Sequence, residues 1–504
     1  MTQRYDALVI GAGFGGLGAA LTLASAGARV ALVEALTYPG GCASTFQRRG
    51  ARYEAGATLF SGFDEHQLFG RWIREHQLPV TVERLDPVIE LRAPGLSLPI
   101  HADREAWVAS LAALPGAPSA AVRDLFALQR RVADALWGLL DSPELLPPFT
   151  LGALARLAAR VPGLLPLLPL AGRPLSAVLA RFGLERFTPL RIALDALCQI
   201  TLQCESDRAE TPFALSVLDY PFRGTGHVVG GAGALAEALL GGVRSRGGDV
   251  RLATRARALT REGGLWRLDA RGETLSAPVV LANLLPQSLP TLAPDLEIPA
   301  SVAALAERAE GGWGAVMLYA LLPEAAPLRS GAHHVEIVVD PDRPMTEGNH
   351  LFCSVSATGE PDRAPPGLRT MTVSTHVAAA PLRALPAAEQ AAKIAEIQRR
   401  MVQGLRRFAP ELADPPSPPM TASPRTFERF TRRPKGLVGG VPRIAGWWNY
   451  NPRLLWPAAV APGLYLVGDT VFPGQSTLAA AIGGQRAAVA ALAGLTGRSL
   501  PAPA

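Results

Sequence analysis

The stretch DALVIGAGFGGLGAALTLASAGARVALVE, residues 6–34, decides the fold class. It begins with a short apolar strand over 7–10 and a glycine-rich loop. A helix with one apolar face follows, and then a second strand over 30–33 that ends in Glu34. This order of elements is typical of a Rossmann-type dinucleotide-binding unit. We therefore predict an α/β protein built on a parallel sheet.

Each part of this stretch has a physical role. Gly11 allows the tight turn, Gly13 lets the backbone approach a pyrophosphate, and Gly16 lets the helix pack closely on the strand. The helix N-terminus offers free N–H groups and partial positive charge to phosphates. Glu34 can accept hydrogen bonds from the ribose hydroxyls of an adenosine. The alternative, a glycine-rich turn without a ligand, leaves the flanking strand, helix and acid unexplained.

A second glycine pair indicates which dinucleotide is bound. Gly40 and Gly41 follow the ribose acid closely in the sequence. NAD does not need such a pair, whereas the pair suits a loop folded back over a bound flavin nucleotide. We therefore expect FAD.

The C-terminal string LYLVGDTVFPGQSTLAAAIGG, residues 464–484, is predicted to reach the same site. An apolar strand over 464–467 is followed by Gly468, which allows close approach. Asp469 can accept a hydrogen bond from a ribityl hydroxyl. The alternative is an ordinary buried strand followed by a turn and a helix.

The helix in this string is expected to start at about Leu478, with Ser476 or Thr477 as its N-cap. Pro473 and Gly474 make the turn before it. The first turns of the helix carry no acid. Its positive end can therefore stabilise the negative charge that a reduced flavin carries along its N1–C2=O edge.

These motifs resemble those of the flavoprotein superfamily of amine oxidases and carotenoid desaturases. Residues 463–484 are very similar to the C-terminal flavin motif of bacterial carotenoid desaturases and of plant and cyanobacterial carotenoid isomerases. Residues 423–442 resemble the segment that precedes this motif. The resemblance implies that 226–259 returns the chain to the flavin domain, with the backbone of Val250 near the adenine. It also implies noncovalent FAD, because no cysteine lies near the C-terminal motif.

A chain of 504 residues is too long for one hydrophobic core. We expect a discontinuous Rossmann-type FAD-binding domain, a mixed-sheet substrate domain and a helical, membrane-facing insert. The expected segments are 1–100, 221–290 and 446–504 for the FAD-binding domain, 101–220 for the insert, and 291–445 for the substrate domain, with strands over 313–320, 335–339 and 370–377.

Within the insert, residues 145–183 are strongly apolar but are interrupted by prolines and arginines. This pattern does not suit a membrane span. It suits either a monotopic patch that dips into one leaflet or a hydrophobic helical core. In the resembling family a lipid-soluble polyene is thought to enter at this insert. The aromatic cluster over 446–456 could line an apolar tunnel, lie at a membrane interface, or pack within a loop.

Composition narrows the class further. The net charge of +6 is spread over single basic residues, which argues against nucleic-acid binding and leaves room for a basic face toward anionic lipid. The four cysteines have no metal-ligand spacing, so we expect a reducing compartment and no metal. No signal peptide is recognisable. We expect a cytoplasmic protein that is peripheral on the membrane.

No catalytic side chain can be assigned from the sequence. His227 is expected to be a structural histidine, with a proton shuttle as the alternative, and His333 and His334 are expected to form an exposed pair. A flavin enzyme that takes hydride from a hydrocarbon needs no further motif, because the isoalloxazine ring carries that chemistry.

The leading functional prediction is an FAD-dependent oxidoreductase acting on a long apolar polyene. We expect carotenoid desaturation, with electrons passed to a quinone or to oxygen. The alternatives are a carotenoid cis–trans isomerase that uses reduced FAD, a flavin amine oxidase, and a flavin-binding lipid carrier without redox turnover.

Overall fold

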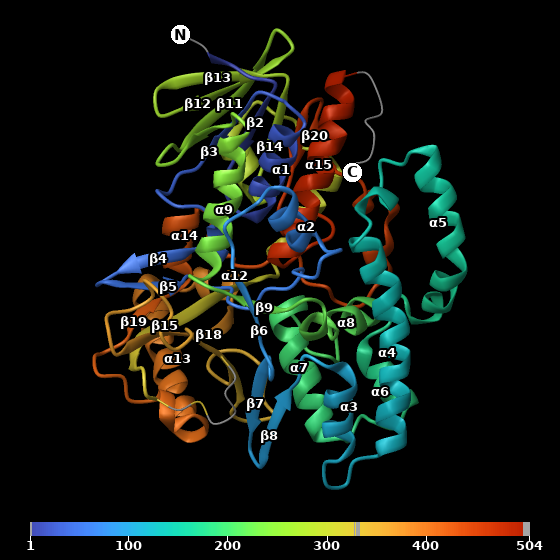
Figure 1. The fold of residues 1–504 in the computed structure, drawn as a ribbon, viewed down its shortest axis with the longest axis vertical. Coiled ribbons are helices and arrows are strands. Elements are labelled where there is room, and N and C mark those ends of the chain that lie inside the picture. The colour runs from blue at the N-terminus through green and yellow to red at the C-terminus, as the bar shows by residue number, and fades with distance from the viewer. Residues whose placement is uncertain (1–2, 327, 329–332, 497–504) are drawn as a thin grey trace.

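The structure is a computed structural model that describes residues 3–326, 328 and 333–496. Its centre is a six-stranded sheet assembled from distant parts of the chain (Figure 1). All its strands are parallel except β20 at one edge, which is antiparallel. The order across the sheet is β10 (Asp249–Arg251), β3 (Val30–Val33), β2 (Ala7–Ile10), β14 (Val279–Ala282), β21 (Leu464–Leu466) and β20 (Ala458–Ala461).

The central strands are short, apolar and buried along their whole length, as parallel strands covered on both faces must be. One face packs against three helices, α1 (Phe14–Ser25), α9 (Ala232–Ser245) and α15 (Thr477–Thr496). The discontinuous Rossmann-type domain predicted from the sequence is therefore confirmed.

The other face of the central sheet packs against a four-stranded sheet and two helices in a second hydrophobic cluster. These elements are β1 (Gln3–Arg4), β13 (Glu273–Ala277), β12 (Leu265–Ala270), β11 (Ala256–Glu262), α10 (Leu289–Leu292) and α11 (Ala300–Ala309).

A separate seven-stranded mixed sheet forms the substrate domain. Its order is β19 (Met420–Ala422), β15 (Trp313–Pro323), β18 (Leu368–Ala378), β17 (His350–Val355), β16 (His334–Val338), β7 (Ile89–Ala93) and β8 (Leu96–Ile100). The three strands predicted in this region are confirmed as β15, β16 and β18. Because β7 and β8 pair into this sheet, strand pairing puts the end of the first FAD-binding segment near residue 88, not at residue 100.

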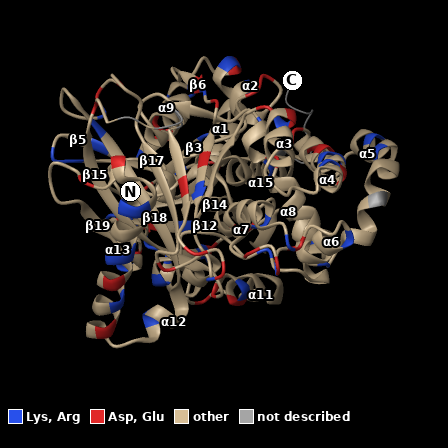
Figure 2. Cartoon of the chain, turned by 90° about the horizontal axis from the view of Figure 1, so that it is seen from below, with Lys and Arg blue, Asp and Glu red and all other residues tan. Residues whose placement is uncertain are grey.

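The outer face of the seven-stranded sheet is covered by α13 (Ala387–Phe408). This helix carries both basic and acidic residues along its length (Figure 2). Smaller elements complete the fold: β4 (Thr45–Arg48), β5 (Ala51–Glu54), β6 (Val82–Arg84), β9 (Gly226–Val228), α2 (Leu68–Glu75), α12 (Ala379–Ala384) and α14 (Pro424–Thr431).

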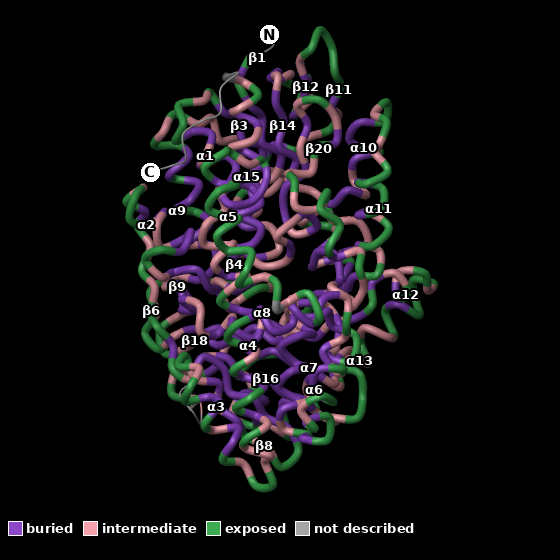
Figure 3. Tube along the Cα trace, turned by 90° about the vertical axis from the view of Figure 1, so that its right-hand side faces the viewer, coloured by how far each residue is buried: buried purple, intermediate pink, exposed green. Residues whose placement is uncertain are grey.

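The insert is helical, as predicted. It contains α3 (Arg104–Ala112), α4 (Ser119–Leu140), α5 (Leu151–Leu164), α6 (Leu175–Arg181), α7 (Thr188–Leu202) and α8 (Thr211–Val217). Most of these helices share a core with β7 and β8. In contrast, α5 lies at the outside of the molecule (Figures 1 and 3) and buries only Ala153. The hydrophobic-core alternative therefore does not describe α5.

Among the described residues, one helix has the length and apolarity of a membrane span. It is α15, and 72% of its most apolar window is buried within the protein. Its apolar character is therefore explained by packing in the centre of the FAD-binding domain.

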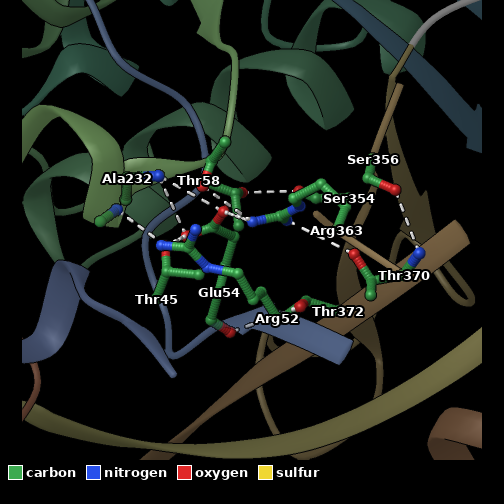
Figure 4. Close-up of polar contacts among 12 residues, drawn as sticks. Thr45, Arg52, Glu54, Thr58, Ala232, Ser354, Ser356, Arg363, Thr370 and Thr372 are labelled. Atoms are coloured by element: carbon green, nitrogen blue, oxygen red, sulfur yellow. Dashed lines mark hydrogen bonds and ion pairs between the residues drawn. The ribbon is translucent and has the colours of Figure 1, made fainter. Parts of the chain in front are cut away.

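A buried ion pair joins the β4–β5 hairpin to the loop between β17 and β18 (Figure 4). Arg363 Nη1 lies 2.8 Å from Glu54 Oε1 at the end of β5, and both side chains are less than a tenth exposed. The same carboxylate accepts hydrogen bonds from Thr45 Oγ1 and from the N–H of Ala232 at the start of α9. Arg363 also contacts Thr370 Oγ1 on β18. This cluster therefore fixes the N-terminus of α9 against the substrate sheet.

We predict that Arg363→Met strongly destabilises the protein, because it leaves the Glu54 carboxylate charged and buried without its partner. The expected loss is about 3–5 kcal/mol in the free energy of unfolding. Urea denaturation measures this loss. The matched control is Arg267→Met, which removes an exposed pair with Glu262 (2.8 Å) and should cost no more than about 1 kcal/mol. Equal effects of the two substitutions would contradict the prediction.

Candidate functional site

The glycine loop between β2 and α1 forms one wall of the site. Gly11 adopts a φ of +91°, a conformation that favours glycine. A Cβ on Gly16 would overlap the carbonyl oxygen of Gly11, so this glycine allows the helix to pack on the loop. Gly13 precedes α1, whose first turn has no side-chain cap and no acid. The free N–H groups of this turn are therefore available to a phosphate.

Glu34 stands at the end of β3 beside this loop. Its carboxylate accepts hydrogen bonds from the backbone N–H groups of Ala12 (2.7 Å) and Leu36 (2.8 Å). These bonds fix the side chain and leave lone pairs free for ribose hydroxyls. Burial raises the pKa of Glu34, and the two backbone hydrogen bonds oppose that rise.

The second glycine pair folds back on the first. Gly40 and Gly41 both have positive φ, +110° and +61°. The N–H of Gly40 donates to the carbonyl of Ala12 (2.8 Å), and a Cβ on Gly41 would lie 3.5 Å from the Cα of Gly13. The second glycine pair therefore lies against the first glycine loop, and its position over a bound flavin nucleotide stays a prediction.

The C-terminal strand reaches the same place, but Asp469 is not a free acceptor there. Its carboxylate pairs with the guanidinium of Arg433 at 2.8 Å. Burial opposes the charge on Arg433, but the Asp469 carboxylate raises the pKa of this arginine, which therefore stays charged. The sequence prediction had missed Arg433. The two Nη atoms of Arg433 donate to the two carboxylate oxygens of Asp469, one to each. The remaining lone pairs of these oxygens are left for a ribityl hydroxyl.

The start of α15 matches the prediction closely. The helix begins at Thr477, and Ser476 Oγ accepts a hydrogen bond from the N–H of Ala479 (3.0 Å), as an N-cap does. Gly474 has a φ of +123° in the preceding turn. The hydroxyl oxygen of Thr477 is buried and has no hydrogen-bond partner among the described residues. An unpaired buried hydroxyl at a helix N-terminus fits a site that receives a ligand.

Val250 lies at the edge of the central sheet. It belongs to β10 and pairs with Leu32 of β3. A few residues later the same segment lines the cavity, at 254–257. That the backbone of Val250 lies near the adenine stays a prediction.

Asn283 is a site residue that the sequence analysis missed. It directly follows β14, and its side chain lies between the N-terminal loop and the C-terminal strand. A Cβ on Gly13 would lie 2.6 Å from Asn283 Nδ2, and a Cβ on Gly468 would lie 2.7 Å from Asn283 Oδ1. Glu34, Asn283 and Asp469 all follow parallel strands of one sheet. The sequence could have indicated Asn283 as a site residue, because it is a polar residue directly after the apolar run 279–282.

These elements surround one cavity of about 840 Å³, near the upper end of the usual range for small-molecule sites. Of the predicted residues, eight line it: Gly11, Gly13, Glu34, Gly40, Gly41, Gly468, Asp469 and Thr477. Gly16, Val250 and Gly474 do not line it.

The other half of the cavity is apolar and lies between the helical insert and the seven-stranded sheet. The side chains that enclose it come from α4, α7, α8, β15 and β17. Among them are Leu136, Trp137, Leu140, Leu197, Ile200, Phe213, Val217, Met317 and Phe352. The chain thus joins a dinucleotide-binding cradle directly to a long apolar chamber.

The histidines differ from the sequence expectation. His334 is buried, with its Nδ1 2.9 Å from Ser354 Oγ, so the prediction that His333 and His334 form an exposed pair was wrong. Burial lowers the pKa of His334 to about 3 and that of His333 to about 4. His227 bonds to Glu360 (3.1 Å), in keeping with a structural role. Only His376, whose pKa burial lowers to about 3, lines the cavity.

Two further observations bear on what the site can bind. Among the described residues, no group of three or more potential metal ligands lies together. Cys42 lines the cavity next to the second glycine pair, and burial raises the pKa of its thiol. A protonated thiol is a weak nucleophile.

Comparisons with known proteins agree with this geometry. Residues 9–75 match the family model described as an NAD(P)-binding Rossmann-like domain. The chain is 25% identical to a chloroplastic prolycopene isomerase of Arabidopsis thaliana, over 98% of this chain and 84% of the isomerase. It is 27% identical to a neurosporene-forming phytoene desaturase of Cereibacter sphaeroides, over 55% of this chain and 52% of the desaturase.

Solved structures share the fold across almost the whole chain. An oxidoreductase from Methanosarcina mazei superposes with a TM-score of 0.63 at 17% identity, covering 95% of this chain and 98% of its own. Putrescine oxidase bound to putrescine gives a TM-score of 0.63 at 15% identity, covering 98% and 100%. The resemblance to carotenoid isomerases and desaturases and the predicted fold class are thus confirmed.

We predict that Gly16→Ala abolishes dinucleotide binding, because its Cβ would overlap the Gly11 carbonyl and push α1 off the loop. Flavin content per protein and the urea midpoint measure the effect. The control is Gly241→Ala in α9, where a Cβ would meet nothing within 4 Å. That change should stabilise the protein by up to about 1 kcal/mol and leave flavin content unchanged. Normal flavin content in the Gly16 variant would show that the close approach is not required.

Proposed function

We propose that the protein is an FAD-dependent oxidoreductase that acts on a long apolar polyene of the carotenoid type. The observation that carries this proposal is the single cavity, in which a dinucleotide cradle opens into an apolar chamber. The relatives that act on carotenoids support the same conclusion.

FAD is proposed to be held noncovalently. The helix α1 N-terminus and Gly11 and Gly13 would receive the pyrophosphate, and Glu34 would receive the adenosine ribose. Asp469, oriented by Arg433, would receive a ribityl hydroxyl. When bound, the flavin supplies hydride acceptance or donation at its ring. The protein's part is to hold the polyene against that ring and to exclude water, which the apolar chamber does.

An amine substrate fits the cavity less well. Protonated amines need a carboxylate or an aromatic cage to receive the ammonium group. Arg443 is the charged residue that lines the cavity next to Phe213, and a cation there repels an ammonium group. Sharing a fold with putrescine oxidase therefore does not by itself imply an amine substrate for this chain.

Peripheral membrane contact is part of the proposal. Apart from Phe430, the exposed large apolar residues among the described ones come from two segments, 151–168 and 447–456, which we call the α5 face: Leu151, Leu154, Val161, Leu165, Leu168, Trp447, Tyr450 and Trp456. Trp456 contacts Phe149 (6.1 Å between ring centroids), and the Trp447 indole lies against Gly172. The aromatic cluster and the insert thus form one surface, and Leu146 and Leu455 of the same segments line the cavity. A contiguous apolar surface of this kind is typical of a membrane or protein contact.

The α5 face also suggests how substrate and electrons move. A carotenoid or a quinone dissolved in one leaflet would reach the cavity beside Leu146 without crossing water. We place the protein in the reducing cytoplasm, in keeping with its four free cysteines.

Desaturation is the first candidate reaction. It removes a hydride and a proton from neighbouring carbons, forms a C=C bond, and passes two electrons by way of the flavin to a quinone or oxygen. Cis–trans isomerisation is the second candidate and consumes no acceptor. One observation favours it: the prolycopene isomerase is similar over nearly the whole chain, whereas the desaturase is similar over about half.

We predict that protein reconstituted with FAD releases it on heat denaturation. When the oxidised, anaerobic holoenzyme is mixed with acyclic carotenes, a desaturase will lose its flavin band in step with a red-shifted product. If the flavin stays oxidised, and chemical reduction yields only cis–trans conversion at constant chromophore length, the isomerase candidate replaces the desaturase. A supernatant without flavin would overturn the cofactor assignment.

We also predict that the protein floats with anionic liposomes. Replacing Leu151, Leu154, Leu165 and Leu168 by serine should abolish flotation without changing flavin content, because these side chains are exposed. Phe430→Ser, at an exposed residue of α14 outside the α5 face, is the control and should still float. Continued flotation of the fourfold variant would contradict the membrane proposal.

A further inference from the structure

Arg443 is a half-buried cation at the edge of the cavity. It lies between the rings of Phe213 and Trp448, with its guanidinium carbon 4.8 Å and 5.7 Å from their centroids. It also lines the cavity. Burial lowers its pKa to about 10, which leaves the group charged near neutral pH.

This guanidinium has few direct partners. Among the described residues, its side chain makes one hydrogen bond, from Nη2 to the carbonyl oxygen of Pro473 at 3.2 Å. Glu210 attracts it and opposes the lowering of its pKa, but the Glu210 carboxylate accepts its hydrogen bonds from the N–H groups of Gly172 and Phe213 and from the hydroxyl of Tyr450. The guanidinium therefore has donors left for an anionic group in the cavity.

The N-terminus of α15 lies at the same place. A Cβ on Gly474 would lie 3.0 Å from Nη2 of Arg443, so the arginine touches the turn that leads into the helix. The buried, unpartnered hydroxyl of Thr477 opens the first turn. A helix N-terminus carries partial positive charge, which adds to that of the guanidinium. Two independent sources of positive charge and one free hydroxyl thus converge on one part of the cavity.

This part of the cavity lies where its two halves meet. The loop between β21 and α15 starts at Asp469 in the dinucleotide half. Phe213, beside Arg443, belongs to the apolar half. The reactive end of a dinucleotide cofactor must lie at this junction in order to meet an apolar substrate.

We propose that Arg443 and the first turn of α15 together receive the negative charge that develops along the N1–C2=O edge of FAD when it is reduced. This inference rests on the proposed function, since it takes FAD as the cofactor. The oxidised ring is neutral and the reduced ring is anionic at this edge, so a fixed cation favours the reduced form. Arg443 is therefore a residue that sets the reduction potential. Both candidate reactions depend on a reduced flavin.

The test compares Arg443→Gln with a second arginine that makes no ion pair among the described residues. Arg486 is buried, its pKa is also lowered to about 10, and its guanidinium donates to the carbonyl of Pro147 (2.8 Å). Arg486 does not line the cavity. The first readout is the two-electron midpoint potential of the bound flavin. The second is the Kd for sulfite, because sulfite adds to the flavin and leaves its N1–C2=O edge negatively charged.

Wild-type holoenzyme should form a sulfite adduct. Arg443→Gln should raise the sulfite Kd at least tenfold and favour the oxidised flavin at least tenfold, which lowers the two-electron potential by about 30 mV or more. Arg443→Lys, which keeps the charge, should stay within about threefold of the wild type. Arg486→Gln should stay within about twofold.

Several outcomes would overturn the inference. An unchanged flavin midpoint potential in Arg443→Gln would overturn it. A shift of the potential in Arg486→Gln equal to that in Arg443→Gln would also overturn it. If Arg443→Gln does not fold, the test uses the wild type instead. A wild-type holoenzyme that forms no sulfite adduct would then overturn the inference. An unchanged potential with weakened binding of a polyene carboxylate would assign Arg443 to the substrate. Failure of the wild type to take up FAD would instead overturn the proposed function itself.

Discussion

The side chain of Asn283 fixes the geometry on which the site depends. It directly follows the central strand β14 and packs against neighbours that must be glycine, because a Cβ on them would overlap it. Gly13, Gly15 and Gly468 all approach it more closely than any other residue type could. Residues from the two ends of the chain are thereby held against one amide. The shape of the cavity depends on this contact, because the glycine loop and the segment after β21 both line it.

A second constraint joins this cradle to the substrate sheet. The buried pair of Glu54 and Arg363 holds the N-terminus of α9, and the pair of Asp469 and Arg433 holds the segment that crosses from the substrate domain back to α15. Each pair joins residues from different domains. The walls of the apolar chamber therefore belong to different parts of the sequence, and these pairs help to hold the walls together.

Much of the cradle could be predicted from the sequence because its signals are local. Glycine spacing, an acid directly after an apolar strand and an uncharged helix start are all readable within about 30 residues. Arg433, Arg443 and Asn283 were missed because their roles depend on partners far away in the chain, such as Phe213 for Arg443. β7 and β8 were assigned to the wrong side of a boundary, because strand partners cannot be identified from a single apolar run. His334 was expected to be exposed for the same reason.

The order of strands in the central sheet has a consequence for how the protein is made. β2 pairs with β14, and β14 pairs with β21, so the sheet needs residues 7–10, 279–282 and 464–466 at once. On a ribosome that adds about 5–20 residues per second, the first strand waits roughly 25–90 s for the last. During that time its apolar faces lack their final cover, and non-local pairing is slow in any case. The nascent chain is therefore a natural client for a chaperone, and any truncation before residue 464 removes a strand from the centre of the fold.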